Sequence, residues 1–144
     1  MGVQTSQVRR AIRDQVLQVT GMHELPFPGE YIGRTQNSKA HKGFAVTVST
    51  TNAKEDRQRR TLGYYLQTTA RVIFCHRLRP KDVNADIDNA LDLEASIIIQ
   101  VLQSYASIRP GLEIRFNRSV RTIDDTIEWL ISDSEFTTFH HTGV

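Results

Sequence analysis

The chain has 144 residues, of which 18 are Lys or Arg and 16 are Asp or Glu, and its mean hydropathy is −0.38. This length is typical of one domain, which excludes an enzyme built from separate cofactor and substrate domains. The near-neutral net charge of +2 excludes a polybasic tail protein and an acidic disordered chain. We therefore expect a single domain over residues 1–144.

The charges are strongly segregated along the chain. Residues 34–81 carry eleven Lys and Arg against two Asp and Glu, whereas residues 82–94 carry five Asp and Glu and no Lys or Arg. Oppositely charged patches can set the register of docking and suppress wrong contacts. Two interpretations follow: the blocks guide association with a partner, or they meet and cancel within the folded monomer.

Cysteine, targeting and membrane signals are weak. Cys75 is the only cysteine and lies in an apolar run, so it predicts a buried thiol and no intrachain disulfide. The first residues lack an apolar segment and a small-residue cleavage site, so we expect no signal peptide. Apolar runs such as 97–99 are too short to cross a bilayer. These features favour a protein that contacts no membrane and is assembled in a cytoplasm.

The chain opens with a predicted helix. Thr5 or Ser6 can cap its start, and Gly21 can end it. Apolar residues recur at helical spacing in between: Val8, Ile12, Val16 and Val19.

The next stretch alternates connectors and strands. Residues 25–30 hold two prolines and predict a rigid connector, and residues 30–35 read as a short strand. A polar basic loop is expected over 34–43, a strand with alternating apolar residues over 44–48, and a second polar loop over 49–60.

A long strand is predicted over 62–78, with one apolar face formed by Leu66, Ala70, Val72 and Phe74. Together with the strand at 44–48 it predicts an antiparallel hairpin with an extended tip. Loops of this length are usually functional or disordered, so we expect mobile loops at about 35–43 and 51–61.

The second helix is entered through acidic residues, which the helix dipole favours. Asp82, Asn84 or Asp86 can cap it, and the segment 109–111 breaks it. Its predicted apolar stripe comprises Ile87, Leu91, Ile98, Val101, Leu102 and Tyr105.

Two strands complete the prediction. Residues 112–117 alternate apolar and polar side chains, and residues 125–144 are rich in Thr, Ile, Phe and Trp. The expected fold is α+β: a mainly antiparallel sheet with the N-terminal helix and one long central helix packed on one face.

No common catalytic motif for nucleotide binding, hydrolysis or metallopeptidase activity occurs in the sequence. Asp88 and Asp92 share one side of the predicted helix while Asp86 lies on another, which favours a solvated helix start over a cation site. The five histidines are scattered, and the neighbouring Cys75 and His76 diverge in a strand. We therefore expect no enzyme, no catalytic residue, no cofactor and no metal.

The candidate contact residues of the two basic loops are Lys39 and Lys42 in the first, and Lys54, Arg57, Arg59 and Arg60 in the second. If the loops share one end of the sheet, they form a cationic rim able to meet phosphates. No aromatic residue lies among these cations to stack bases. Docking to an acidic protein surface, or plain solubility, is therefore favoured over a nucleic-acid-binding module using 34–60.

The layout resembles the tail terminator (tail completion) proteins of long-tailed bacteriophages. The resemblance rests on the amphipathic N-terminal helix, the connector LPFPGEYIG, a strand pair with a long polar tip, the long helix entered through DVNADIDNALDLE, and the closing strands with TIEWLISDSEFTTFHH. It covers nearly the whole chain as an order of elements, without an invariant catalytic signature.

The resemblance implies a structural role in the virion. Such subunits form a hexameric ring on the last ring of tail-tube protein, stop tube elongation and present a surface to the head-side connector, while genomic DNA passes through the lumen. It implies a subunit or tube interface at Lys54, Arg57, Arg59, Arg60, Asp86, Asp88 and Asp92, and a docking or lumen-facing loop with Lys39 and Lys42. Another phage neck or head completion protein is the alternative, because such proteins share size and composition.

Overall fold

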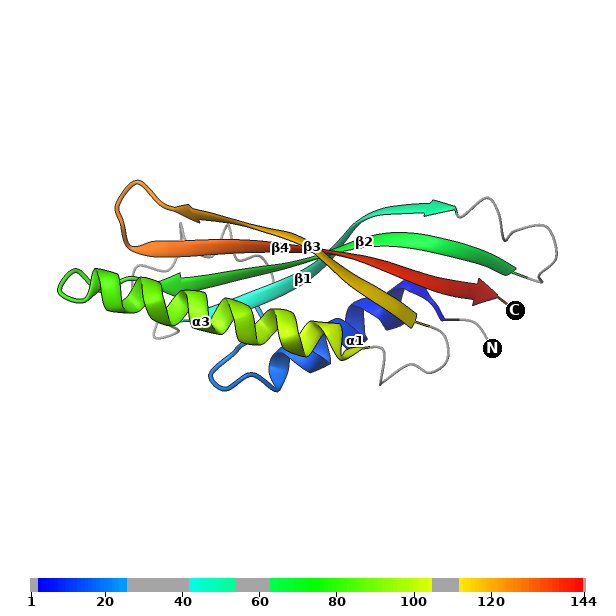
Figure 1. Ribbon diagram of the computed structural model, residues 1–144, viewed down its shortest axis with the longest axis horizontal. Helices are drawn as coiled ribbons and strands as arrows, with labels where there is room; N and C mark the ends of the chain where they lie inside the picture. The colour runs from blue at the N-terminus through cyan, green and yellow to red at the C-terminus, as the bar shows by residue number, and fades with distance from the viewer. Residues whose placement is uncertain (1–2, 26–41, 54–62, 105–111, 144) are drawn as a thin grey trace.

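The computed structural model describes residues 3–25, 42–53, 63–104 and 112–143. They form a four-stranded antiparallel sheet of order β1-β2-β4-β3 with both helices on one face (Figure 1). The elements are α1 (Thr5–Leu17), β1 (Lys42–Ala53), β2 (Gly63–Arg77), α3 (Val83–Leu102), β3 (Leu112–Ile123) and β4 (Trp129–Gly143). The predicted α+β class is confirmed.

The N-terminal helix α1 lies over β1 with the predicted apolar positions turned inward. Its cap residue is Gln4 rather than Thr5 or Ser6, and the Gln4 amide donates to Gln7 Oε1 at 2.6 Å. Gly21 adopts φ +81°, a conformation that glycine reaches at little cost, and so turns the chain after the helix.

The predicted hairpin is confirmed, but β1 is longer than expected. Residues 49–53, which the sequence assigned to a polar loop, belong to β1: 50–53 pair with β2, beyond an irregularity between Val48 and Thr50. Threonines face one another here, and the hydroxyls of Thr51 and Thr68 lie 3.3 Å apart. Such β-branched pairs favour strand pairing although their polarity suggests a loop.

The helix α3 is confirmed, with Asp82 at its cap position, but its buried face differs from the predicted stripe. Leu91 is 37% exposed. The buried residues are Asp86, Ala90, Glu94, Ile97 and Val101. Two carboxylates therefore enter the helix–sheet interface, because each has an arginine partner there.

The core lies between the helices and one face of the sheet. In β2 and β4 the even-numbered residues face the helices and are largely buried, as the predicted apolar face of β2 required. The largest fully buried side chains include Phe44, Phe74, Phe136, Ile12 and Ile97. The odd-numbered residues lie on the opposite face, which no helix of the described chain covers.

The final strand, predicted over 125–144, begins only at Trp129. Residues 124–128 form a turn between β3 and β4, and only the part from Trp129 onward pairs with β2. Asp124 holds this turn, since its Oδ1 accepts from the amides of Glu128 at 2.8 Å and Trp129 at 2.9 Å. A carboxylate that bonds backbone amides in this way competes with continued strand pairing.

Several expectations lie outside the described residues. These are the short strand at 30–35, the tip of the hairpin at 54–62, and most of the connector 25–30 and of the basic loop 34–43. Within the described ranges, no helix is both long and apolar enough to cross a membrane.

Candidate functional site

The residues predicted to contact partners divide into two groups. Lys42, Asp86, Asp88 and Asp92 are described: three of them line one pocket, and Asp88 lies on α3 outside it. The others lie outside the described residues: Lys39, Lys54, Arg57, Arg59 and Arg60.

A pocket of about 550 Å³ lies beside the N-terminal half of α3, next to the start of β1 and the end of β2. Its charged and titratable lining residues are Lys42, His76, Arg77, Arg79, Asp86 and Asp92. The sequence separates these residues by up to 50 positions, and antiparallel pairing of β1 with β2 brings Lys42 opposite His76.

Asp86 is buried and bonded within its own chain. The Arg79 amide donates to Oδ2 at 2.8 Å, and its guanidinium donates to Oδ1 at 2.9 Å and to Oδ2 at 3.0 Å. These bonds lower the pKa of Asp86 to about 2. The expectation of a solvated acidic helix start is therefore corrected at Asp86, whose carboxylate is turned inward in this conformation.

Asp88 and Asp92 are exposed, and Asp92 lines the pocket while Asp88 does not. In the described part of the chain, neither side chain has an ion-pair partner. Both are therefore exposed carboxylates of α3 that form no ion pair with another described residue.

His76 is buried, and its Nδ1 donates to the Arg77 carbonyl at 2.8 Å. Burial lowers the pKa of His76, and the positive charges of Lys42 and Arg79 act in the same direction. The histidine is therefore neutral near pH 7, and the cations of the pocket are lysine and arginine. Arg77 is 6.0 Å from the centre of the Trp129 ring, a distance at which a cation–π contact forms.

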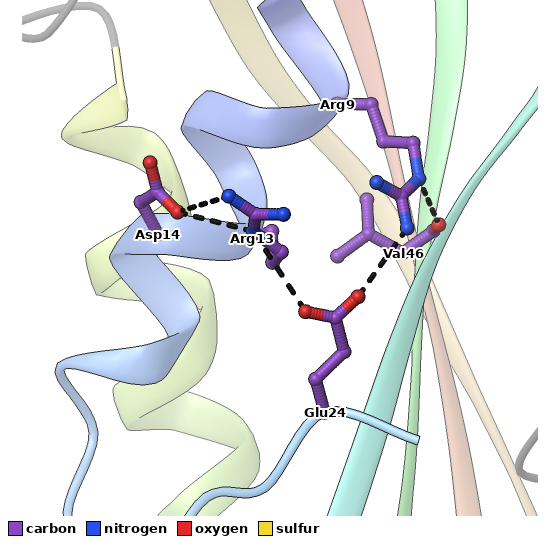
Figure 2. A network of polar contacts seen from close by, with 5 residues as sticks. All are labelled: Arg9, Arg13, Asp14, Glu24 and Val46. Atoms are coloured by element: carbon purple, nitrogen blue, oxygen red, sulfur yellow. Dashed lines mark hydrogen bonds and ion pairs between the residues drawn. The ribbon is translucent and has the colours of Figure 1, made fainter. Parts of the chain in front are cut away.

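Two arginines of α1 contact other parts of the chain. Figure 2 shows Arg9 reaching β1, where its Nε donates to the Val46 carbonyl at 3.1 Å. Glu24 lies between two arginines, with Oε1 3.4 Å from Arg9 Nη2 and Oε2 3.7 Å from Arg13 Nε. Arg13 also contacts Asp14 at 2.9 Å.

This network holds a short segment against the outer edge of β1. The Leu25 amide donates to the Phe44 carbonyl at 2.6 Å, and the Phe44 amide donates to the His23 carbonyl at 2.9 Å. The approach is close, because a Cβ built at Gly43 would lie 2.2 Å from Leu25 Cδ1. Glycine at position 43 is thus required for the segment to cover the edge.

A second buried carboxylate joins α3 to the sheet. Glu94 accepts from Arg121 Nε through both oxygens, at 3.0 and 2.8 Å, and also from the Ser132 hydroxyl. The sequence placed Glu94 among solvated acids, and nothing in its spacing relates it to Arg121. Among the described residues, no group of three or more His, Cys, Asp or Glu is arranged to hold a metal ion.

The strand ends that flank residues 54–62 lie far from the start of α3. The tip that carries Lys54, Arg57, Arg59 and Arg60 joins Ala53 to Gly63, at the opposite end of β2 from the start of α3 (Figure 1). The 15 residues of β2 span about 45 Å at about 3.3 Å per residue. The exposed carboxylates of α3 therefore lie far from the strand ends that hold the basic tip.

Comparisons with known proteins give little further information. No family model matches the chain, and no curated protein matches it. Among solved structures it is similar to the type 4 fimbrial biogenesis protein PilO from Pseudomonas aeruginosa, with 8% identity and a TM-score of 0.37 over 97% of this chain and 72% of that one. A likeness at this level carries no conclusion about function.

Proposed function

We propose that this chain is a structural virion protein, a tail terminator that caps the tail tube of a long-tailed phage as a ring. The order of elements supports the proposal: an N-terminal helix, a long hairpin, one long helix and a second hairpin. This is the order on which the resemblance to tail terminators rests. Assembly would take place in the host cytoplasm, without a membrane or a cofactor.

The observation that carries the proposal is the distance between the exposed acids of α3 and the strand ends that hold the basic tip. The exposed Asp88 and Asp92 lie at one end of β2, and the strand ends that hold the basic tip lie at the other. The end of β2 beside α3 carries both signs of charge, because Lys42, Arg77 and Arg79 lie there with the acids. Only the exposed Asp88 and Asp92 lack an ion-pair partner among the described residues, and a basic segment that met them would form head-to-tail contacts between copies. Such heterologous contacts close into a ring when the rotation allows. Lys54, Arg57, Arg59 and Arg60 of one subunit would then meet Asp88 and Asp92 of the next subunit, or the tube protein.

The remaining predicted residues have lesser roles in this proposal. Lys42 lies at the pocket beside Asp92, where it can pair with an acidic side chain of a tube or connector protein. Asp86 acts indirectly, because its bonds to Arg79 fix the start of α3. Lys39 belongs to the predicted docking or lumen-facing loop, past which genomic DNA would move without sequence-specific binding.

Light scattering and negative-stain microscopy test the ring. The expected result is rings of about six subunits, as in the resembling proteins, formed alone or on tail tubes of the same phage. The charge reversal Asp88→Lys with Asp92→Lys should abolish them, and Arg57→Glu with Arg59→Glu and Arg60→Glu in the same chain should restore them. Asp14→Lys is the matched control, since Asp14 is exposed but lies on α1, away from both proposed contacts.

A protein that remains monomeric and does not bind tube ends would refute the proposal. Binding to the head-side connector without binding to tubes would also refute it, and would identify a neck protein instead. Binding to duplex DNA that weakens steeply as the salt concentration rises would identify a nucleic-acid-binding module. In that case the arginine variant should show a weaker dependence of the binding constant on salt.

A further inference from the structure

The two edges of the sheet differ in how much of their backbone is hydrogen-bonded by other residues of the chain. The outer edge of β1 is covered at Phe44 by residues 23–25 and at Val46 by the Arg9 guanidinium. Along the outer edge of β3, no hydrogen bond from any described residue reaches the backbone. An uncovered edge strand presents amide and carbonyl groups to which another strand can bond.

Apolar side chains accompany this free edge. Phe116 is 39% exposed, Val120 is 53% exposed and Ile123 is 41% exposed. All three belong to β3, so the apolar surface follows the strand whose outer backbone groups bond no described residue. Strand addition to a sheet edge uses this combination, with backbone bonds for affinity and side chains for register.

The arginines of β3 do not protect the edge as free charges would. Each is paired with an acid of its own chain: Arg115 with Glu113 at 2.8 Å, Arg118 with Glu135 at 3.8 Å, and Arg121 with Glu94. Unpaired charges on an edge strand discourage association with another edge strand. Because the arginines of β3 are paired with acids, they oppose such association less.

We propose that β3 pairs with β3 of a second copy, antiparallel and with the two-fold axis at Val120, so that two four-stranded sheets join into one of eight strands. This proposal goes beyond the proposed function and does not depend on it.

The faces of β3 support this register. Val120 pairs with Asp133 and lies on the face without helices, whereas Phe116 pairs with Phe136 and Ile123 with Leu130 on the helix face. Asn117 is an extra residue, because Phe116 and Arg118 pair with consecutive residues of β4. With the axis at Val120 the two copies of Val120 are opposite each other, and Phe116 faces Ile123 of the second copy across the bulge.

Neighbouring registers are disfavoured by like charges or by mismatched side chains. Directly opposite residues of two paired strands lie on the same face of the sheet. The two-fold axis must therefore lie midway between the two copies of one residue. An axis at Arg118 or at Arg121 would oppose two arginines, which is destabilising. An axis at Ser119 would place Val120 against Arg118.

The charge distribution is compatible with the antiparallel direction, although Arg115 and Arg118 already have acidic partners in their own chain. Arg115 and Arg118 lie near the start of β3, and the turn after the strand carries Asp124, Asp125 and Glu128. Antiparallel pairing about Val120 places the arginine end of each copy beside the acidic turn of the other. Such a two-fold contact is isologous and closes after two copies, so it cannot itself propagate into a ring.

Single cysteines test the register in the full chain. Val120→Cys places two thiols opposite each other, within the Cα separation of about 4.4–6.8 Å that a disulfide allows. Thr122→Cys is the matched control: it lies on the same face, but the two copies are displaced by four residues, about 13 Å along the strand. Wild-type protein controls for Cys75, which is buried with a pKa raised to about 11.

The expected result is a covalent dimer from Val120→Cys under mild oxidation and none from Thr122→Cys alone. A mixture of Arg118→Cys and Thr122→Cys chains should cross-link to each other, because these positions are opposite in the proposed register. Equal cross-linking of all variants, or no dimer from Val120→Cys, would overturn the proposal.

Sedimentation over a dilution series tests the pair without cross-linking. In the variant Asp88→Lys with Asp92→Lys, in which the proposed ring contact is removed, the chain should show a reversible monomer–dimer equilibrium. Adding Val120→Lys should abolish the dimer, since it opposes two ammonium groups. Ile99→Lys is the control, because Ile99 is similarly exposed but lies on α3. A double variant that stays monomeric, or a dimer that survives the added Val120→Lys, would contradict the proposal.

Discussion

Glu94 of α3 and Arg121 of β3 form an unequal ion pair, in which the carboxylate is 3% exposed and the guanidinium remains half exposed. Arg121 Nε lies 2.8 Å from Glu94 Oε2. The charge removed from water is thus that of the acid, while the base keeps much of its solvation. The two partners should therefore differ in what their removal costs.

Arg121→Met should lower the free energy of unfolding by about 3 kcal/mol, because it leaves Glu94 buried without its ionic partner. Glu94→Gln should cost less, since the arginine it releases can be solvated. Urea denaturation at pH 7 measures both. Arg115→Met, whose partner Glu113 is exposed, should change stability by at most about 1 kcal/mol. Equal losses for Arg121→Met and Glu94→Gln would contradict the inequality.

Asp86 should contribute to acid sensitivity. Its pKa is about 2 in the folded chain against 3.8 for the free group, so its contribution is fully present above pH 3.8 and is lost as the pH falls towards 2. Asp86→Asn should lower the melting temperature at pH 7 and flatten its decline between these pH values. Asp88→Asn, at an exposed position, should leave the curve unchanged. A parallel shift of the whole curve in Asp86→Asn would contradict this assignment.

His140 should make stability depend on pH in a higher range. It is fully buried, with Nδ1 donating to the Val3 carbonyl at 2.9 Å and Nε2 3.0 Å from Thr68 Oγ1. Burial lowers its pKa below 6.5, so the unfolded chain binds the proton more readily and stability falls as the pH drops below 6.5. The free energy of unfolding, measured by chemical denaturation at several pH values, should depend less on pH in His140→Gln than in the wild type. His23 is exposed, and His23→Gln should keep the pH dependence of the wild type. An unchanged pH dependence in His140→Gln would count against this origin.

Ile127 should be strained in the β3–β4 turn. Its φ is 56°, in the left-handed region that a β-branched side chain rarely adopts. Ile127→Gly should therefore stabilise the chain by about 1 kcal/mol, as relief of such strain is worth about 1–3 kcal/mol before the added chain entropy of glycine. Thermal unfolding of Ile127→Gly and Ile127→Ala separates strain from loss of the side chain, because alanine keeps the Cβ. Destabilisation by glycine would show that the turn has another conformation in solution.

The local pattern of the sequence predicted the elements whose buried face is apolar. Residues 66–74 alternate and form β2, and Val8, Ile12 and Val16 mark α1. In both cases the nearest neighbours in sequence carry the information that decides the structure. The order of elements and the antiparallel hairpin followed from these residues alone.

The predictions that were wrong concern residues whose partners approach them only in the folded chain. Asp86 and Glu94 are buried because Arg79 and Arg121 approach them in the fold, and helical spacing indicates neither pair. Residues 49–53 are in β1 because β2 lies beside them. The cover on the β1 edge similarly needs Glu24 between two arginines of α1. Polar residues with tertiary partners are read as surface when only the sequence is considered.

The most direct measurement for the proposed role is the length of tail tubes assembled with and without this protein. Tail-tube protein of the same phage, polymerised in vitro, should give shorter tubes of bounded length with a ring at one end when the chain is present. The double variant Asp88→Lys with Asp92→Lys should leave tube length unchanged, and Asp14→Lys should act as wild type. Tubes that elongate equally with and without the wild-type chain, and carry no ring, would contradict a tail terminator.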